Sequence, residues 1–342
     1  MKTADVLVIG AGPCGLFQVF ELGLQGLGAI VVEALDQPGG QCAELYPQKP
    51  IFDIPAIPEI SGAQLTQNLM RQIEPFKAQF CFGERIEALE PRGERFWLRG
   101  SRGTEFDVAA VVIAAGAGAF QPVRLKLDGV EAFEGRQLFY AVKDRAQFRN
   151  RDLVIFGGGD SALDWALSLV PEARSVVLVH RSERFRAQSA LVDQMHELCA
   201  QGHMRFVAGR ASSYRQTNGD LSAVELADSE GGKQWLEADS LLVFFGMVPD
   251  PGPVKHWGLA MEANQVQVGT ERFETSIPGV FAIGDINTYP GKKKLILSGF
   301  HEAALAAFAI KARLEPGKRV HLQYTTTSPL LRRRLGVEAD RD

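Results

Sequence analysis

The sequence predicts an α/β fold built from two doubly wound βαβ modules, the second inserted into the first. Two short apolar runs, residues 5–9 and 152–156, each lead into a glycine-rich loop and then a helical pattern. Gly10 lies 23 residues before Glu33, and Gly157 lies 23 residues before His180. The chain also holds 35 glycines among 342 residues, about 10% against an average near 7%. We therefore expect places where the backbone approaches another group closely.

Composition limits the class of protein. A chain of 342 residues with 46% hydrophobic and 23% charged residues fits two globular domains of roughly 100–200 residues each. No apolar run approaches the ~20 residues of a membrane span. The net charge of −4 argues against a nucleic-acid binder. The four cysteines form no CxxC pair, which favours a reducing, cytoplasmic location.

The first module begins with the strand at residues 5–9. The loop Gly10-Ala11-Gly12-Pro13-Cys14-Gly15 follows, and a helical pattern continues through residues 16–24. Pro13 suits the first turn of a helix, where its missing N–H has no partner to lose. A second strand, residues 29–32, ends at Glu33. Residues 80–89 and 95–98 read as antiparallel strands, and residues 111–113 as a buried strand before Gly116.

The second module repeats this order. After the strand at 152–156 come Gly157-Gly158-Gly159-Asp160-Ser161, a helix to about Val170 and a strand at 175–179. Residues 240–245 read as a further strand. Residues 280–283 form a last strand before Gly284-Asp285, an Ala-rich helix covers 298–314, and a polar extension begins at Glu315. We predict one domain from 1–117 and 247–342 and a second from 118–246.

Each glycine loop suits a pyrophosphate group. A GxGxxG/A turn leaves the backbone bare, so that phosphate oxygens lie against the N–H groups and positive dipole of the next helix. In the first loop Gly10, Gly12 and Gly15 carry the pattern, and Glu33 can accept hydrogen bonds from both ribose hydroxyls of an unphosphorylated adenosine. The alternative is a purely structural glycine turn.

The second loop predicts a different nucleotide. His180 and Arg181 stand where the first module has Glu33, and Arg184 and Arg186 follow. A carboxylate there would repel a 2′-phosphate, whereas imidazole and guanidinium groups bind it through charge-assisted hydrogen bonds. The second module should therefore bind NADP(H). The alternative is a solvated basic face.

Further along, Asp285 follows the strand-like Phe281-Ala282-Ile283-Gly284. A short acid at this place can hold a polyol hydroxyl, or it can cap a helix.

Together these motifs resemble the thioredoxin-reductase-like flavoproteins over essentially the whole chain: GAGPCG, GGGDSA, HRSERFRA and FAIGD. The resemblance implies two Rossmann-like domains of the three-layer ββα type, with FAD in the first and Asp285 facing its ribityl chain. The NADP contacts that it implies are Gly158, Gly159, Asp160, Ser161, His180, Arg181 and Arg186.

Two families of disulfide-using relatives are excluded by their missing cysteines. Residues 139–144, where thioredoxin reductases carry CxxC, contain no cysteine. Cys42 follows Gly39-Gly40-Gln41, as in lipoamide-type reductases, but position 47 is proline. Electron transfer to a dithiol is therefore not expected.

The segment Gly39-Gly40-Gln41, with Tyr46-Pro47 beyond it, and residues 323–328 resemble the thioredoxin-reductase-like ferredoxin–NADP⁺ reductases of bacteria. In that family Tyr46 would stack on one flavin face and Tyr324 of the extension on the other. The implied reaction passes hydride from NADPH to flavin N5 and then single electrons to ferredoxin or flavodoxin, with no acid or base residue. The implied FAD contacts are Gly10, Gly12, Pro13, Cys14, Gly15, Glu33, Gly40, Gln41, Tyr46, Ile86, Phe120, Gly284, Asp285, Tyr324, Thr325 and Thr326.

An acidic ferredoxin should dock on basic residues. From residue 286 onward the chain has 11 Lys and Arg against 5 Asp and Glu, and opposite charges steer association. The candidate docking residues are Lys292, Lys293, Lys294, Arg332, Arg333 and Arg334. A solvated turn and tail are the alternative. The resemblance also implies a homodimer.

Two other functions stay open at this stage. The chain could be an NADPH-dependent reductase of a small disulfide that uses Cys14 or Cys42, because a thiolate is stabilised at a helix N-terminus. It could also be a flavin- and NADPH-binding sensor without turnover. Burial beneath FAD would leave Cys14 inert, and His301 reads as a packing residue.

Overall fold

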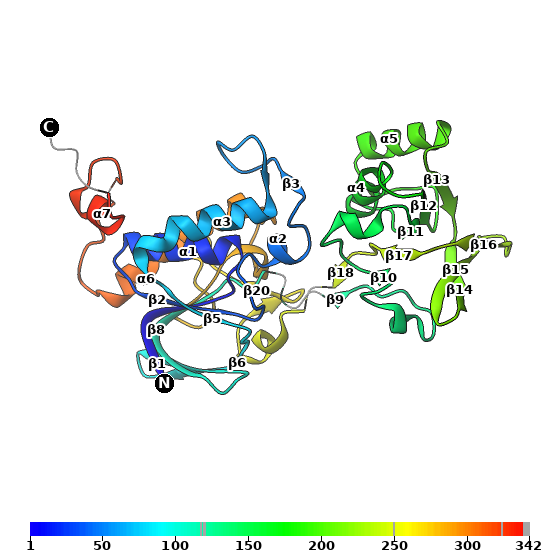
Figure 1. Ribbon diagram of the computed structural model, residues 1–342. Helices are drawn as coiled ribbons and strands as arrows, with labels where there is room; N and C mark the ends of the chain where they lie inside the picture. Colours follow the sequence, from blue (N-terminus) through cyan, green and yellow to red (C-terminus); the bar gives the residue numbers. More distant parts are fainter. Residues whose placement is uncertain (117, 119–120, 249, 323, 338–342) are drawn as a thin grey trace. The chain divides into compact units, whose positions relative to one another are not determined.

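The computed structural model describes residues 1–116, 118, 121–248, 250–322 and 324–337. The chain forms two units, one from Met1–Ala119 and Pro249–Asp342 and the other from Phe120–Val248 (Figure 1). The assignment of one cofactor to each unit, with boundaries at 117/118 and 246/247, stays a prediction. None of the described helices is both long and apolar enough to cross a membrane.

A seven-stranded sheet forms the centre of the first unit. Five strands are parallel: β5 (Gln79–Phe82), β2 (Ala29–Glu33), β1 (Lys2–Ile9), β8 (Glu105–Ile113) and β21 (Val280–Ala282). The start of β8 also pairs antiparallel with β7 (Arg95–Gly100), which pairs with β6 (Ile86–Arg92). The carboxyl ends of β1, β2, β8 and β21 therefore meet at one edge, where α/β proteins bind ligands.

The prediction of one antiparallel strand over residues 80–89 was wrong. Residues 79–82 form β5, which is parallel to β2, and β6 begins only at Ile86. Gly83 adopts a positive φ of 66° between them, and its N–H donates to the carbonyl of Leu35. A left-handed turn at a glycine therefore separates two strands that look continuous in the sequence.

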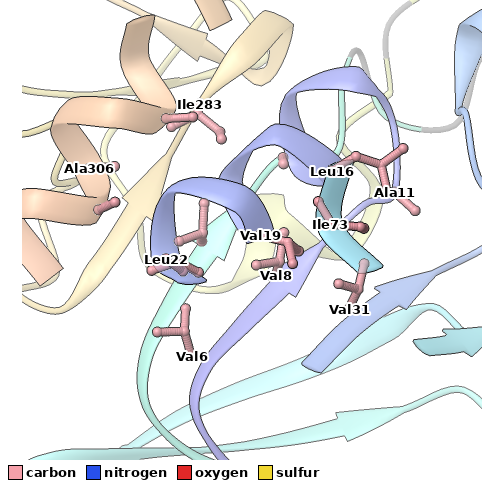
Figure 2. Packing of buried hydrophobic residues seen from close by; sticks show 14 of the residues in the cluster. Val6, Val8, Ala11, Leu16, Val19, Leu22, Val31, Ile73, Ile283 and Ala306 are labelled. Carbon is pink, nitrogen blue, oxygen red and sulfur yellow. The ribbon is translucent and has the colours of Figure 1, made fainter. Parts of the chain in front are cut away.

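Successive side chains of the parallel strands point to opposite faces of the sheet and pack into two separate hydrophobic cores. On one face Val6, Val8 and Val31 pack against α1 (Pro13–Leu24), α3 (Gly62–Ile73) and α6 (Ile296–Leu314), as Figure 2 shows for α1 and Ala306. On the other face Leu7 and Ile30 pack against β6, β7 and Trp257. The shorter elements of this unit are α2 (Gln41–Glu44), β3 (Pro50–Ile51), β4 (Ile60–Ser61), β19 (Met261–Glu262), β20 (Gln265–Gln267) and β22 (Asn287–Thr288), with 3₁₀ turns at Glu74–Phe76, Gly252–His256 and Gly284–Ile286.

The second unit has its own parallel sheet. Its strand order is β10 (Leu138–Phe139), β17 (Ser240–Val243), β11 (Asp152–Phe156), β12 (Ser175–His180) and β13 (Arg205–Ala208). Helices α4 (Asp160–Leu169) and α5 (Ser189–Ala200) share one core with Leu153 and Ile155. The other face packs against an antiparallel sheet of β14 (Arg210–Thr217), β15 (Asp220–Ala227) and β16 (Lys233–Glu237). The remaining elements are the paired β9 (Gln121–Pro122) and β18 (Met247–Val248), and 3₁₀ turns at Val130–Phe133 and Arg145–Phe148.

The C-terminal extension contains a helix that the sequence analysis missed. Helix α7 (Pro329–Arg334) packs on α1 with Leu331 only 5% exposed. The guanidinium of Arg334 donates to the carbonyl of Leu24, the last residue of α1. A cation at a helix C-terminus satisfies a carbonyl without an intrahelical partner and complements the dipole. The extension is therefore anchored to the C-terminal end of α1.

Candidate functional site

Two glycines of the first loop, Gly10 and Gly15, leave no room for a side chain. Gly10 has a φ of +108°, and a Cβ there would lie 2.4 Å from the carbonyl oxygen of Ala114; a Cβ on Gly15 would lie 2.0 Å from that of Gly10. Helix α1 begins at Pro13 with Gly12 as N-cap, no side-chain cap and no acid in its first turn. Its first N–H groups therefore remain available to an anion.

The Gly39-Gly40-Gln41 turn packs directly on this loop. The N–H of Gly39 donates to the carbonyl of Ala11 at 2.8 Å, and a Cβ on Gly40 would lie 3.0 Å from the Cα of Gly12. The side-chain amide of Gln41 lies beside Gly116, 3.2 Å from where a Cβ would be. Two segments predicted to contact one ligand are thus brought together.

Glu33 is engaged with the loop itself. One carboxylate oxygen accepts from the N–H of Ala11 at 2.7 Å and the other from Leu35 at 2.9 Å, and the residue is 7% exposed. Each oxygen retains a further acceptor site. The ribose contact of Glu33 stays a prediction, and in the structure Glu33 holds the glycine loop against the end of β2.

Asp285 is an acid of the site whose carboxylate has no hydrogen-bond partner among the described residues. It is half-buried, and its carboxylate makes no hydrogen bond to any residue in the described part of the chain. Burial raises its pKa, while the ammonium groups of Lys292 and Lys294 lower it. The 3₁₀ turn at this place has Ile283 as N-cap and no side-chain cap. Asp285 is therefore not a helix cap and is free to bind a ligand hydroxyl.

The two cysteines of the site are protonated thiols at neutral pH. Burial, with smaller contributions from Asp285 and Glu302, raises the pKa of Cys14 to about 12. Burial also raises the pKa of Cys42, whose Sγ donates to the Tyr46 hydroxyl at 3.6 Å, and it raises the pKa of Tyr46. For Cys14 desolvation thus outweighs the stabilisation expected at a helix N-terminus. Neither thiol is activated as a nucleophile.

The remaining predicted FAD contacts are placed less favourably. Ile86 is 2% exposed in the second core cluster, so only its backbone can meet a ligand. Phe120 lies outside the described residues. Tyr324, Thr325 and Thr326 are exposed in the extension, where the carbonyl of Thr326 accepts from Arg332 at 2.6 Å. The structure does not bring Tyr324 to Tyr46, because α7 lies at the C-terminal end of α1 and the glycine loop at its N-terminal end (Figure 1).

The loop of the second unit contacts the predicted phosphate-binding residues. A Cβ on Gly158 would lie 2.5 Å from the ring of His180, and the carbonyl of Gly158 accepts from the N–H of Arg186 at 2.7 Å. Burial, with the charges of Arg181 and Arg186, lowers the pKa of His180. Both arginine side chains are exposed.

The first turn of α4 completes the loop of the second unit. Gly159 is the N-cap of α4 and Ser161 is exposed. Asp160 accepts from the N–H of Gln188 at 2.8 Å and so secures the segment after His180.

One predicted docking residue was misassigned. The side chain of Lys292 is only 6% exposed and pairs with Glu302, which is fully buried. Lys293 and Lys294 are exposed, as is Arg333, whereas Arg334 is bound to α1. Sequence reasoning missed Glu302; an acid within the apolar pattern of an Ala-rich helix was the available signal.

Comparison with known proteins identifies the family. A sequence profile of the pyridine nucleotide-disulphide oxidoreductases matches residues 4–308. The chain belongs to this family. It is 54% identical over 336 residues to a ferredoxin–NADP reductase 2 of Cupriavidus taiwanensis, covering 98% of this chain and 91% of that protein. It is 53% identical over 340 residues to a ferredoxin–NADP reductase of Polaromonas sp., covering 98% and 93%.

A solved structure shows the same fold. The thioredoxin reductase of Lactococcus lactis superposes with a TM-score of 0.77 at 23% identity, covering 91% of this chain and 99% of that one. The predicted fold class and family resemblance are confirmed.

Proposed function

We propose that this chain is a ferredoxin–NADP⁺ reductase that transfers electrons between NADPH and ferredoxin or flavodoxin through FAD. The observation that carries the proposal is a nucleotide-binding site without a redox dithiol. All four cysteines are free, and the two near the glycine loop, the partly buried Cys14 and the buried Cys42, are protonated thiols. Relatives more than 50% identical over nearly the whole chain support the same function.

The first unit fits FAD. The bare backbone of Gly10, Gly12 and Gly15 at the start of α1 would hold the pyrophosphate. Asp285, whose carboxylate makes no hydrogen bond within the described part of the chain, would accept from the ribityl chain. Gln41 and Tyr46 would border the flavin ring from the adjoining turn. When bound, FAD and NADPH supply the redox chemistry, hydride transfer followed by release of single electrons. The chain has to bind and orient both groups and needs no proton-transfer residue.

The second unit fits NADP(H). The N-terminus of α4, with Gly159 as N-cap, would hold the pyrophosphate. His180 lies against the glycine loop, and the exposed guanidinium groups of Arg181 and Arg186 are free to bind a 2′-phosphate. A ribose without that phosphate would leave these cations unpaired, so the site should prefer NADPH to NADH.

Tyr324 is proposed to cover the flavin of a second copy in a homodimer. Helix α7 is anchored at Leu24, the last residue of α1, whereas the glycine loop lies at the first turn of α1. Twelve helical residues span roughly 18 Å. An extension held at the far end of the helix is better placed to reach the site of another subunit than its own. Its exposed apolar residues, Leu322 and Tyr324, at 64% and 65%, would then be covered.

We assign ferredoxin docking to Lys293 and Lys294, two exposed cations beside the Asp285 loop. Arg333 is exposed on α7, at the other end of α1, and forms a separate basic site. Opposite charge on an acidic partner would accelerate association, and the effect would be screened by salt.

The deciding experiment is NADPH-driven reduction of cytochrome c with and without added ferredoxin. We expect strict dependence on ferredoxin, retained in the Cys14→Ser/Cys42→Ser double variant. Reduction of a small disulfide that disappears in the double variant would instead establish the thiol-dependent alternative. NADPH binding without any turnover would establish the sensor.

A further inference from the structure

A buried ion pair lies behind the loop that carries Asp285. Glu302, on α6, has no exposed surface, and the side chain of Lys292 is 6% exposed. The Lys292 ammonium bonds to one oxygen of the Glu302 carboxylate. The two residues stand ten apart, on either side of the start of α6. Neither has a role in the electron transfer proposed above.

Both members of the pair also hold Gly284. The N–H of Gly284 donates to the second carboxylate oxygen of Glu302 at 2.7 Å, and Lys292 donates to the carbonyl of Gly284 at 2.9 Å. Gly284 has a φ of +73° and directly precedes Asp285. One ion pair therefore holds the peptide groups on both sides of a left-handed glycine, which defines the direction in which the chain enters Asp285.

Neighbouring side chains complete the hydrogen bonding of Glu302. Asn287 donates from its amide nitrogen to Glu302 at 2.9 Å and to the carbonyl of Ala282 at 2.8 Å. The Tyr289 hydroxyl donates to the oxygen that Lys292 contacts, at 2.9 Å. The carboxylate thus accepts four hydrogen bonds, from a main-chain N–H and three side chains. Its orientation is fully determined by the chain itself.

We propose that the Lys292–Glu302 pair is a positioning clamp that sets Asp285 for FAD binding. The proposal rests on FAD binding by the first unit and not on ferredoxin as the partner. Buried ion pairs often give no more stability than apolar residues of similar volume. An apolar pair would not hold an N–H and a carbonyl of the same residue at once. The clamp should therefore matter more for cofactor affinity than for folding.

The test compares FAD affinity with apoprotein stability. In the Lys292→Met/Glu302→Gln double variant the charges are removed together, and the glutamine can still accept from Gly284. The Gly284 carbonyl, however, loses its lysine partner. We expect a melting temperature of the apoprotein near that of the unmodified protein, and an FAD dissociation constant at least tenfold higher by fluorescence titration. Lys318→Met, which removes a lysine whose side chain is 74% exposed in the same unit, should leave the dissociation constant within twofold.

FAD affinity within twofold of the unmodified protein in the double variant would overturn the proposal. Equal losses of stability and of affinity would also overturn it, because they would indicate a merely structural pair. A second measurement needs no variant. In the unmodified apoprotein the Gly284 amide should exchange slowly with deuterium, because its partner belongs to the chain. Rapid exchange at Gly284 without FAD would contradict the clamp even if the double variant did not fold.

Discussion

Three consecutive lysines show that neighbouring residues of one type can have separate roles. Lys292 is bonded inside the first unit, whereas Lys293 and Lys294 face solvent. Sequence alone treats the three as one basic run, because charge runs usually lie on a solvated face. The difference arises from tertiary structure. Of the three, Lys292 is bonded to the fully buried Glu302 carboxylate, and a buried charge requires such a partner. The separate role of Lys292 is visible only from its contact with Glu302, which lies ten residues further along the chain.

Cys14 should be chemically inert. With its pKa at about 12, the thiolate fraction at pH 8 is roughly a thousandfold below that of a free cysteine. Because a raised pKa keeps the thiol protonated, its alkylation by iodoacetamide should stay slow between pH 7 and 9, as followed by mass spectrometry. Glutathione in the same reaction is the reference thiol. Labelling of Cys14 at the glutathione rate would refute this assignment.

Arg181 and Arg186 should determine the choice of nucleotide. A charge-assisted hydrogen bond contributes about 1.5–3 kcal/mol, so Arg181→Gln or Arg186→Gln should raise the KM for NADPH roughly 10- to 100-fold. The KM for NADH should change less than threefold, because NADH has no 2′-phosphate. Equal increases for both nucleotides would indicate damage to the loop rather than loss of phosphate recognition.

His180 should make NADPH binding depend on pH. Burial and the neighbouring arginines lower its pKa, so the imidazole is neutral at pH 7 and gains a proton only below the ordinary ~6.5. Protonation adds a positive charge beside the phosphate. The affinity for NADPH, measured by calorimetry relative to His180→Gln, should therefore increase as the pH falls from 7 to 5.5. If the ratio of the NADPH affinities of the two proteins stays constant with pH, His180 does not contact the phosphate.

At the scale of elements, the extension owes its position to one short helix. Leu331 is 5% exposed while its neighbour Leu330 is 39% exposed, which provides a matched pair of variants. Leu331→Ala removes buried apolar contacts worth about 2–5 kcal/mol, enough to release a six-residue helix. Deuterium exchange over residues 324–337 should accelerate in Leu331→Ala and stay unchanged in Leu330→Ala. Similar exchange in both variants would show that α7 is held by Arg334 alone.

Helices and strands could be predicted from the sequence where the local pattern of apolar and turn residues determines them. The strand–glycine loop–helix units appear close to the predicted residues, for example β11 at Asp152–Phe156, because buried parallel strands are short apolar runs between turn residues. The break between β5 and β6 and the helix α7 were not predicted. The first depends on the φ of Gly83, and the second on an apolar contact with α1 that the extension's own composition does not encode.

For the whole molecule, the sequence located the glycine loops and Asp285 but not the interactions among them. The contact between Gly40 and Gly12, and the double use of Glu33, arise only when separate segments meet. Motifs with a local backbone requirement are visible along the chain. Hydrogen bonds between distant residues, such as those of Glu302, are visible only in three dimensions.

Charge distribution should govern the encounter with ferredoxin. The chain has a net charge of −4, yet Lys293 and Lys294 are both exposed, and the charge of Lys294 acts on Asp285. The Lys293→Met/Lys294→Met variant should raise the KM for ferredoxin about 3- to 10-fold, while the KM for NADPH stays unchanged. The rate of ferredoxin reduction should also fall less steeply with rising salt concentration than in the unmodified enzyme. A salt dependence identical to that of the unmodified enzyme would exclude this surface as the docking site.

The close approach of Gly40 to Gly12 has a kinetic consequence. Their contact, with the bond from Gly39 to Ala11, uses only main-chain atoms and glycine Cα groups, so it does not require the cofactor. The two segments proposed to line the pyrophosphate site are therefore already in contact without FAD, and we expect little loop ordering in the binding step. Refolded apoprotein should take up FAD in a single second-order phase, with a rate proportional to FAD concentration and no slow rearrangement after the encounter.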